Sequence, residues 1–91
     1  MLKAVKFGAH LKEIRIHLCP KGETSKGIRD FIQKNYVSIK ECNPNSPILI
    51  RECSGVQPRL WARYEYGKEN SVSLTDLNES DIAQKFANLV K

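Results

Sequence analysis

The sequence lacks the features that define several large groups of proteins. None of its apolar runs approaches the ~20 residues that a membrane-spanning helix needs, and no segment has the composition of a secretory signal. The three cysteines include no Cys-x-x-Cys pair. No phosphate-binding loop, Ser/His/Asp set or pair of acids suggests a hydrolase or a nucleotide-binding enzyme. These absences argue against a membrane-spanning protein and an extracellular disulfide scaffold.

Size and charge limit the remaining classes. The chain has 91 residues, enough for one domain with a modest core. Its formal charge of +5 is unevenly placed. Residues 1–68 carry thirteen basic and six acidic side chains, whereas residues 69–91 carry two basic and four acidic ones. A basic body indicates nucleic acid, an acidic protein partner or an alkaline organelle, and a solvated basic surface is the plainer alternative.

We expect residues 1–11 to form a basic N-terminal arm and residues 12–91 to form the folded domain. The arm contains Lys3, Lys6 and His10 and no acid. An acid-poor, amphipathic composition is typical of mitochondrial import sequences, although these are usually rich in arginine and serine. An import segment that is not cleaved and a disordered tail are also compatible with the composition of this arm.

The centre of the chain predicts a β-α-β unit. Residues 13–18 alternate between polar and apolar, which is the period of a strand. Residues 26–42 show apolar positions at steps of three and four, with Thr24 or Ser25 as the helix cap. Residues 48–50 are apolar throughout, which suits a strand covered on both faces by helices. Such a unit makes the two strands parallel neighbours.

The C-terminal half predicts a hairpin and a closing helix. Residues 60–66 and 71–74 are the expected third and fourth strands, and Ala62, Tyr64 and Tyr66 would share one face. Asn78 is the expected N-cap of the last helix. The resulting order is β-α-β-β-β-α, an α/β fold with a four-stranded mixed sheet and two helices. By analogy of topology, this arrangement is thioredoxin-like.

Cys19 and Cys53 each end a strand of the β-α-β unit. A thioredoxin-type enzyme needs a second cysteine three residues after the first, and here that residue is Gly22. Dithiol catalysis is therefore not expected. The ends of neighbouring parallel strands are close enough for a Cys19–Cys53 disulfide. Two reduced, half-buried thiols fit the same pattern.

Other candidates have plain structural explanations. Cys42 lies on the apolar face of the expected helix and reads as a core residue. His10, His17 and Cys19 lack the spacing of a zinc site. Pro58 precedes the third strand, where a cis or an ordinary trans peptide bond would fit. Trp61 beside basic residues could stack on nucleotide bases, but aromatic residues in strands more often serve packing.

Three strings resemble a known family. They are EIRIHLCP, RDFIQKNYVSIKECNPNSPILIREC and VQPRLWARYEYGKENSVSL. They are similar to the thioredoxin-like accessory subunits of mitochondrial respiratory complex I, NADH:ubiquinone oxidoreductase. The resemblance runs from about Lys12 to Val90. A similar domain occurs in certain mitochondrial ribosomal proteins, which supplies a rival interpretation.

The resemblance implies a location, a composition and a cysteine pair. The protein would be imported and would lie peripherally on the matrix side of the mitochondrial inner membrane, bound to other subunits of complex I. It would have no cofactor, so no flavin, iron–sulfur cluster or quinone site, and no small-molecule substrate. The two strand-end cysteines of the family map onto Cys19 and Cys53 and can form a disulfide there. No role carries over to Cys42.

Our preferred hypothesis is a non-catalytic subunit needed for the assembly or stability of the matrix arm. We expect partner contacts on a basic and aromatic surface made of Arg15, His17, Arg59, Trp61 and Arg63. An RNA-binding or ribosomal module is the second hypothesis, although the acidic C-terminal helix and the absence of a dense basic cluster count against it. A thiol-redox protein is the third.

Overall fold

The computed structural model of the chain describes residues 6–90. Along the sequence, the helices and strands are β1 (Leu11–Leu18), α1 (Lys26–Cys42), β2 (Ile48–Glu52), β3 (Arg59–Tyr64), β4 (Glu69–Ser73) and α2 (Glu79–Leu89). Two short 3₁₀ turns, Glu23–Ser25 and Glu65–Gly67, precede α1 and β4. The predicted β-α-β-β-β-α order is confirmed.

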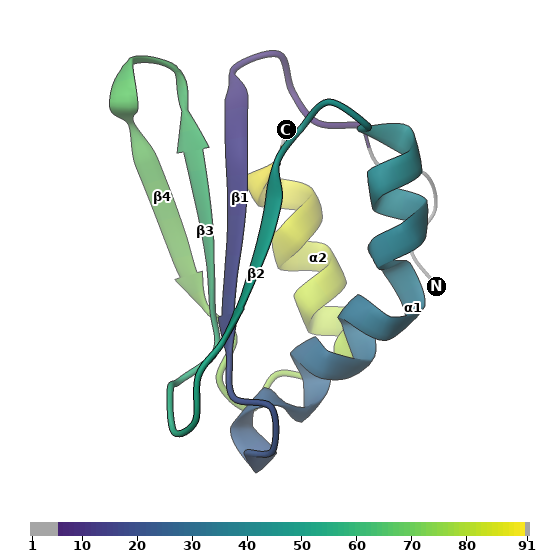
Figure 1. Ribbon diagram of the computed structural model, residues 1–91, viewed down its shortest axis with the longest axis vertical. Helices are drawn as coiled ribbons and strands as arrows, with labels where there is room; N and C mark the ends of the chain where they lie inside the picture. The colour runs from purple at the N-terminus through teal and green to yellow at the C-terminus, as the bar shows by residue number, and fades with distance from the viewer. Residues whose placement is uncertain (1–5, 91) are drawn as a thin grey trace.

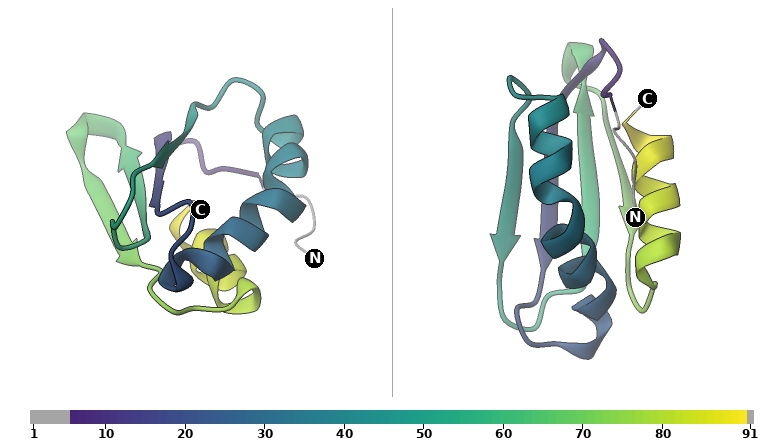
Figure 2. Two further views of the ribbon diagram at one scale, coloured as in Figure 1. Left: turned by 60° about the horizontal axis from the view of Figure 1, so that its bottom comes forward. Right: turned by 90° about the vertical axis from the view of Figure 1, so that its right-hand side faces the viewer.

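The four strands form one mixed sheet in the order β2-β1-β3-β4. β1 and β2 are parallel, and the other two pairs are antiparallel. Both helices lie on the same face of the sheet, as Figures 1 and 2 show. The predicted α/β class and four-stranded mixed sheet are confirmed, and no helix of residues 6–90 lies on the opposite face of the sheet.

The core lies between the sheet and the two helices. Apolar side chains at alternate positions of β1 and β3 point toward the helices. The helices supply apolar positions at steps of three and four. The buried apolar residues are Leu11, Ile14, Ile16, Leu18, Ile28, Phe31, Ile39, Leu60, Ala62, Leu74, Ile82, Phe86 and Val90. Cys42 is only half-buried and lies outside this cluster, so its predicted core role is wrong.

The prediction that β2 is covered on both faces is also wrong. β2 is an edge strand, and helices cover only one of its faces. Leu49 pairs with Arg15, so it lies on the face of the sheet that α1 and α2 do not cover. An apolar run of three residues cannot distinguish a strand inside a sheet from an edge strand with one apolar residue left outside.

The third strand is shorter than predicted. β3 ends at Tyr64, and the chain then enters a 3₁₀ turn in which Tyr66 has a positive φ of 62°. Tyr66 is 93% exposed, so it does not share the face of Ala62 and Tyr64. Aromatic residues are common in strands, and a positive φ is uncommon for a bulky residue. The sequence therefore favoured a strand at Tyr66 rather than a turn.

The two helix caps differ. Asn78 caps α2 as predicted, because its side chain accepts a hydrogen bond from the backbone N–H of Asp81. Ser25 is the N-cap residue of α1 but makes no side-chain capping bond. Its Oγ instead accepts from the backbone N–H of Cys19 at 3.0 Å. This bond ties the end of β1 to the start of α1.

Part of the expected arm contacts the folded body. The ring of Phe7 packs edge-on against Phe86, with the ring centroids 6.0 Å apart. The backbone N–H of Phe7 donates to Oδ1 of Asn43, and that of Gly8 donates to the carbonyl of Val90. These residues therefore link the C-terminal ends of α1 and α2. Residues 1–5 of the predicted arm lie outside the described residues.

Within residues 6–90, no helix is long and apolar enough to cross a membrane.

Candidate functional site

The open face of the sheet gathers side chains from all four strands in three rows. The rows follow the strand register, in which residues opposite one another share a face. The first row is Arg51, His17, Arg59 and Ser73; the second is Leu49, Arg15, Trp61 and Ser71; the third is Glu13, Arg63 and Glu69. We call this surface the open face.

The charges of the third row are balanced within the chain, with the help of Arg15 from the second row. Nε of Arg63 lies 3.1 Å from a carboxylate oxygen of Glu13. Arg15, from the second row, lies 2.8 Å from Glu69 and 3.8 Å from Glu13. Two arginines and two glutamates therefore balance at this end of the sheet.

The first row has no such balance. Within residues 6–90, no carboxylate lies within ion-pair distance of Arg51, His17 or Arg59. Arg59 is held by a hydrogen bond from its Nε to Oγ of Ser71 at 3.1 Å, and Arg51 is exposed. The uncompensated positive charge of the open face therefore lies at the C-terminal ends of β1 and β2.

Trp61 lies at the centre of the open face. The guanidinium carbons of Arg15 and Arg59 lie 5.8 and 5.7 Å from its ring centroid, a distance at which a cation is attracted to the ring. The imidazole of His17 lies beside it at 6.2 Å. Nε1 of Trp61 is buried without a hydrogen-bond partner, alone among the side-chain polar atoms that the structure describes.

A hollow of about 350 Å³ opens at the first row. Its lining comes from the ends of β1 and β2 and from the loop after β2, and consists of Arg15, His17, Arg51, Cys53 and Val56. Two of these five side chains are arginines and a third is a histidine. The hollow therefore suits an anionic group.

The structure brings the five predicted contact residues together on the open face. Arg15, His17, Arg59, Trp61 and Arg63 occupy adjacent positions in the register. Their role in binding a partner stays a prediction. Sequence reasoning missed Arg51, because the apolar residues before it were interpreted as a fully covered strand. The alternation of Leu49 and Arg51 was the available signal.

Cys19 and Cys53 are free thiols in the structure, so the Cys19–Cys53 pairing is not formed in it. Cys19 is buried and Cys53 is exposed. The two residues are nevertheless neighbours, because the backbone N–H of Cys53 donates to the carbonyl of Leu18 at 3.0 Å. The Gln57–Pro58 peptide bond is trans, as every described peptide bond is.

The thiol of Cys19 is surrounded by backbone amides. Hydrogen bonds from the amides of Gly55, Lys21 and Gly22, in that order of effect, lower the pKa of Cys19 below its ordinary value. Burial opposes this change, and the charge of Arg29 adds a smaller lowering effect. Helix α1 begins only at Lys26, so its N-terminus is too far from Cys19 to stabilise the thiolate strongly. The structure shows that loop amides stabilise it instead.

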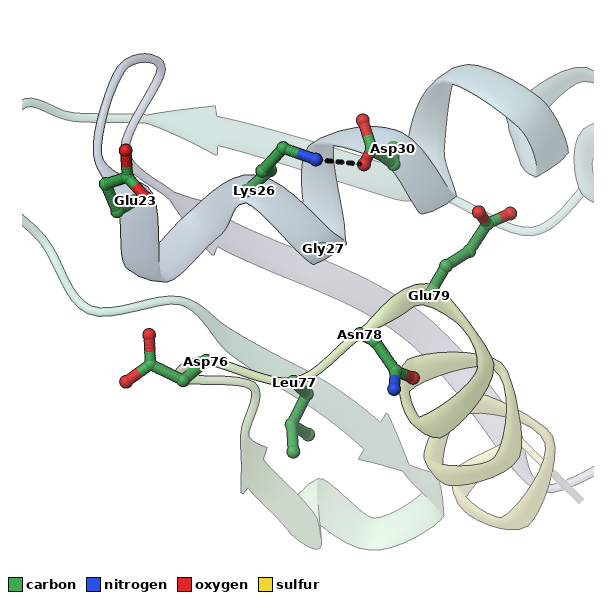
Figure 3. Close-up of a pocket in the computed structure, with 8 residues that line it drawn as sticks. All are labelled: Glu23, Lys26, Gly27, Asp30, Asp76, Leu77, Asn78 and Glu79. Carbon is green, nitrogen blue, oxygen red and sulfur yellow. Dashed lines mark hydrogen bonds and ion pairs between the residues drawn. The ribbon is translucent and has the colours of Figure 1, made fainter.

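A second hollow, of about 250 Å³, lies between the N-terminal ends of α1 and α2 and is shown in Figure 3. Four acidic side chains line it: Glu23, Asp30, Asp76 and Glu79. Asp30 pairs with Lys26 at 3.5 Å. Within residues 6–90, no group of three or more His, Cys, Asp and Glu side chains could hold a metal ion.

Comparison with known proteins shows similarity over nearly the whole chain. Residues 28–79 match the domain described as "Mitochondrial ribosomal protein L51 / S25 / CI-B8 domain". A relative from Mus musculus, named NADH dehydrogenase [ubiquinone] 1 alpha subcomplex subunit 2, is 49% identical, and the alignment covers 97% of this chain and 89% of the relative. The chain belongs to the family of NADH dehydrogenase [ubiquinone] 1 alpha subcomplex subunit 2, whose members share this domain.

Further members of the family occur in distant organisms. A subunit of the same name from Arabidopsis thaliana is 52% identical over 89% of this chain and 84% of its own length. The NADH-ubiquinone oxidoreductase 10.5 kDa subunit of Neurospora crassa is 45% identical over 93% of this chain and 90% of its own length. The L51 / S25 / CI-B8 domain match includes Arg51, Arg59 and Trp61 and begins after Arg15 and His17.

Proposed function

We propose that this chain is an accessory subunit of mitochondrial respiratory complex I, NADH:ubiquinone oxidoreductase, and that it acts by docking to other subunits. The observation that carries the proposal is the identity of 45–52% to relatives named as subunits of this enzyme, over 89–97% of the chain. Identity at this level across three distant organisms supports one shared place in one assembly.

Docking without catalysis is supported by the surroundings of Cys19. Its thiol is buried, and Gly22 occupies the position where a thioredoxin-type enzyme has its second cysteine. The amide of Gly22 donates to Sγ of Cys19 at 3.2 Å. A thiolate stabilised in this way has no neighbouring thiol at position 22 to complete a dithiol cycle.

We assign the protein to mitochondria, at the matrix side of the inner membrane. Its basic body, with thirteen basic and six acidic side chains in residues 1–68, is compatible with the alkaline matrix. Attachment to the membrane would then be indirect, through the larger subunits of the complex.

The open face is the proposed docking surface. Tryptophan and arginine are the residues most enriched among strong contacts in protein interfaces, and Trp61 lies between two arginines at the centre of this face. The opposite face of the sheet is covered by α1 and α2, so it is not available to a partner in the folded chain (Figure 2).

Native-gel electrophoresis of mitochondrial membranes from cells expressing the tagged chain tests the proposal. We expect the chain to migrate with complex I, and we expect cells lacking it to accumulate less of the complete complex. Normal amounts of complex I in cells without the chain would contradict the assembly role. Migration with mitochondrial ribosomes would contradict the assignment to complex I.

A mitochondrial ribosomal protein is the second candidate, because the matching domain is named after two such proteins. It predicts binding to RNA that weakens steeply as salt increases, since several phosphates would be neutralised. The ion pairs of Glu13 and Glu69 on the open face count against it, because carboxylates repel a phosphate backbone.

A further inference from the structure

We propose that the first row of the open face binds an acidic segment of a neighbouring complex I subunit, through two carboxylates that pair with Arg51 and Arg59 on either side of His17. This inference rests on the proposed function and adds the chemistry of the partner. It also divides the predicted contact surface into a part that recognises the partner and a part that is neutralised within the chain.

Charge is the first argument. Arg15 and Arg63 are already paired with Glu13 and Glu69, so a partner would have to displace those carboxylates to gain a salt bridge there. Arg51 and Arg59 make no ion pair with any described residue. A carboxylate brought to the first row therefore meets uncompensated positive charge.

Geometry sets the spacing of the carboxylates. Arg51 and Arg59 both pair with His17 in the register, one from β2 and the other from β3. Neighbouring strands are ~4.8 Å apart, so the two arginine backbones are roughly 10 Å apart. This separation matches side chains three residues apart in a polyproline II segment, which rises about 3.1 Å per residue and returns to the same face every three residues. It also matches side chains seven residues apart on a helix, at about 1.5 Å per residue.

The second row adds an apolar contact. Leu49 and Trp61 lie on either side of Arg15 in the register, and both are half-buried. The buried Nε1–H of Trp61 has no acceptor within residues 6–90. A partner that combines carboxylates with an apolar side chain would satisfy the charge of the first row and cover this strip.

RNA fits the open face less well. A phosphate backbone crossing the three rows would pass Glu13 and Glu69 as well as the arginines. Base stacking on Trp61 would require one face of the ring to be open, but Arg15 and Arg59 both approach the ring. A protein segment limited to the first two rows avoids both conflicts.

The test measures binding of the full-length chain to complex I purified from cells that lack it. The double variant Arg51→Glu with Arg59→Glu should bind at least about tenfold more weakly, as expected when one partner of a charge pair is reversed. The matched control is Lys6→Glu with Lys68→Glu. It changes the net charge by the same amount at two exposed residues outside the three rows, and its affinity should change by less than about twofold. Thermal unfolding of both variants verifies that they fold.

The outcomes separate the two proposals. If the wild-type chain does not bind the depleted complex, the proposed function fails. If it binds and the Arg51/Arg59 variant binds equally well, the acidic-segment inference fails while the proposed function stands. If both double variants lose affinity equally, overall charge accounts for binding and the inference also fails.

Trp61 supplies a local reporter, because it is the single tryptophan of the chain. Its indole N–H gives one signal in a ¹⁵N-correlated spectrum. A synthetic peptide with two glutamates three residues apart and a leucine between them should shift this signal. The same peptide with lysines in place of the glutamates should leave it unchanged. A larger shift with a single-stranded RNA oligonucleotide than with the acidic peptide would overturn the assignment to a protein partner.

Discussion

The backbone N–H of Gly55 lies 3.4 Å from Sγ of Cys19, and this contact joins the loop after β2 to the end of β1. Two residues 36 positions apart in sequence thus meet at the edge of the sheet where the hollow of the open face lies. The amide that approaches the sulfur favours the thiolate over the thiol.

A dependence of stability on pH follows from this contact. The folded-state pKa of Cys19 lies below the ordinary value of 9.0, so the native chain releases the thiol proton at a lower pH than the unfolded chain. The resulting stabilisation is complete above pH 9.0 and is lost as the pH falls through the folded-state pKa. We expect the difference in unfolding free energy between wild type and Cys19→Ser to grow with rising pH.

Denaturant unfolding under reducing conditions measures this difference. Gln33→Ala is the control, because Gln33 is exposed and carries no titratable group, so its offset from wild type should stay constant with pH. A constant offset for Cys19→Ser would show that the loop amides do not stabilise the thiolate.

Thiol accessibility gives a second prediction. Cys53 is exposed, Cys42 is half-buried and Cys19 is buried, so a maleimide should modify the native chain in that order. Mass spectrometry after brief labelling measures the order.

Oxidation before labelling tests the predicted Cys19–Cys53 bridge, which would remove both residues from the labelled set and leave Cys42 reactive. Loss of only one thiol would argue against the bridge.

Gly27 should not tolerate alanine. A Cβ at this position would overlap the carbonyl oxygen of Leu77, so α1 would have to move away from the loop before α2. Alanine favours a helix over glycine by about 1 kcal/mol, but overpacking usually costs about 1–3 kcal/mol, and overlap with a backbone atom is hard to relieve. We expect Gly27→Ala to lower the unfolding free energy by about 1–2 kcal/mol overall.

Gln33→Ala is the control for this experiment, because Gln33 is an exposed residue of the same helix. It should leave stability within about 0.5 kcal/mol of wild type. An increase in stability for Gly27→Ala would mean that the loop moves easily and that helix preference decides the result.

Phe7 should contribute to stability although it belongs to the predicted arm. Phe7→Ala removes an edge-on contact with Phe86, and aromatic pairs contribute about 0.5–1.5 kcal/mol beyond the area that they bury. We expect a loss of about 1–2 kcal/mol in thermal or denaturant unfolding. An unchanged stability would show that residues 6–10 are dispensable for the fold.

Tyr64 links β3 to the end of α2, because its hydroxyl donates to the backbone carbonyl of Leu89. Tyr64→Phe keeps the ring and removes this bond, so it should cost about 1 kcal/mol of unfolding free energy. Tyr66→Phe is the matched control, since Tyr66 is 93% exposed and should be neutral. Equal effects of the two substitutions would contradict a specific role for the Tyr64 hydroxyl.

The sequence predicted the fold well because its periodicities were clear. Alternation from Glu13 to Leu18 and the three- and four-residue steps of α1 depend only on which face meets the core. The sequence did not predict that β2 lies at an edge or that Tyr66 leaves the sheet. Both features depend on how the whole chain packs. Short apolar or aromatic runs in the sequence carry no information about that packing.

The site was predicted less completely. Alternation placed Arg15 and Trp61 outside the core, but the pairing of Glu13 with Arg63 depends on the strand register, and the register depends on turn geometry. The sequence therefore could not show that the charge of Arg63 is compensated while that of Arg51 is not. The hydrogen bonds from backbone amides to the sulfur of Cys19 could not be predicted either, because Gly55 approaches Cys19 only in the folded chain.

Both described helices lie on one side of the sheet (Figure 1), which leaves the open face for a neighbouring subunit, and this has a consequence for the lifetime of the protein in the cell. A neighbour that binds only the native chain stabilises it by mass action. Copies that are not bound to a neighbouring subunit lack that stabilisation. They would therefore unfold and be degraded sooner than bound copies. The abundance of the chain would then follow the supply of the larger subunits rather than its own rate of synthesis.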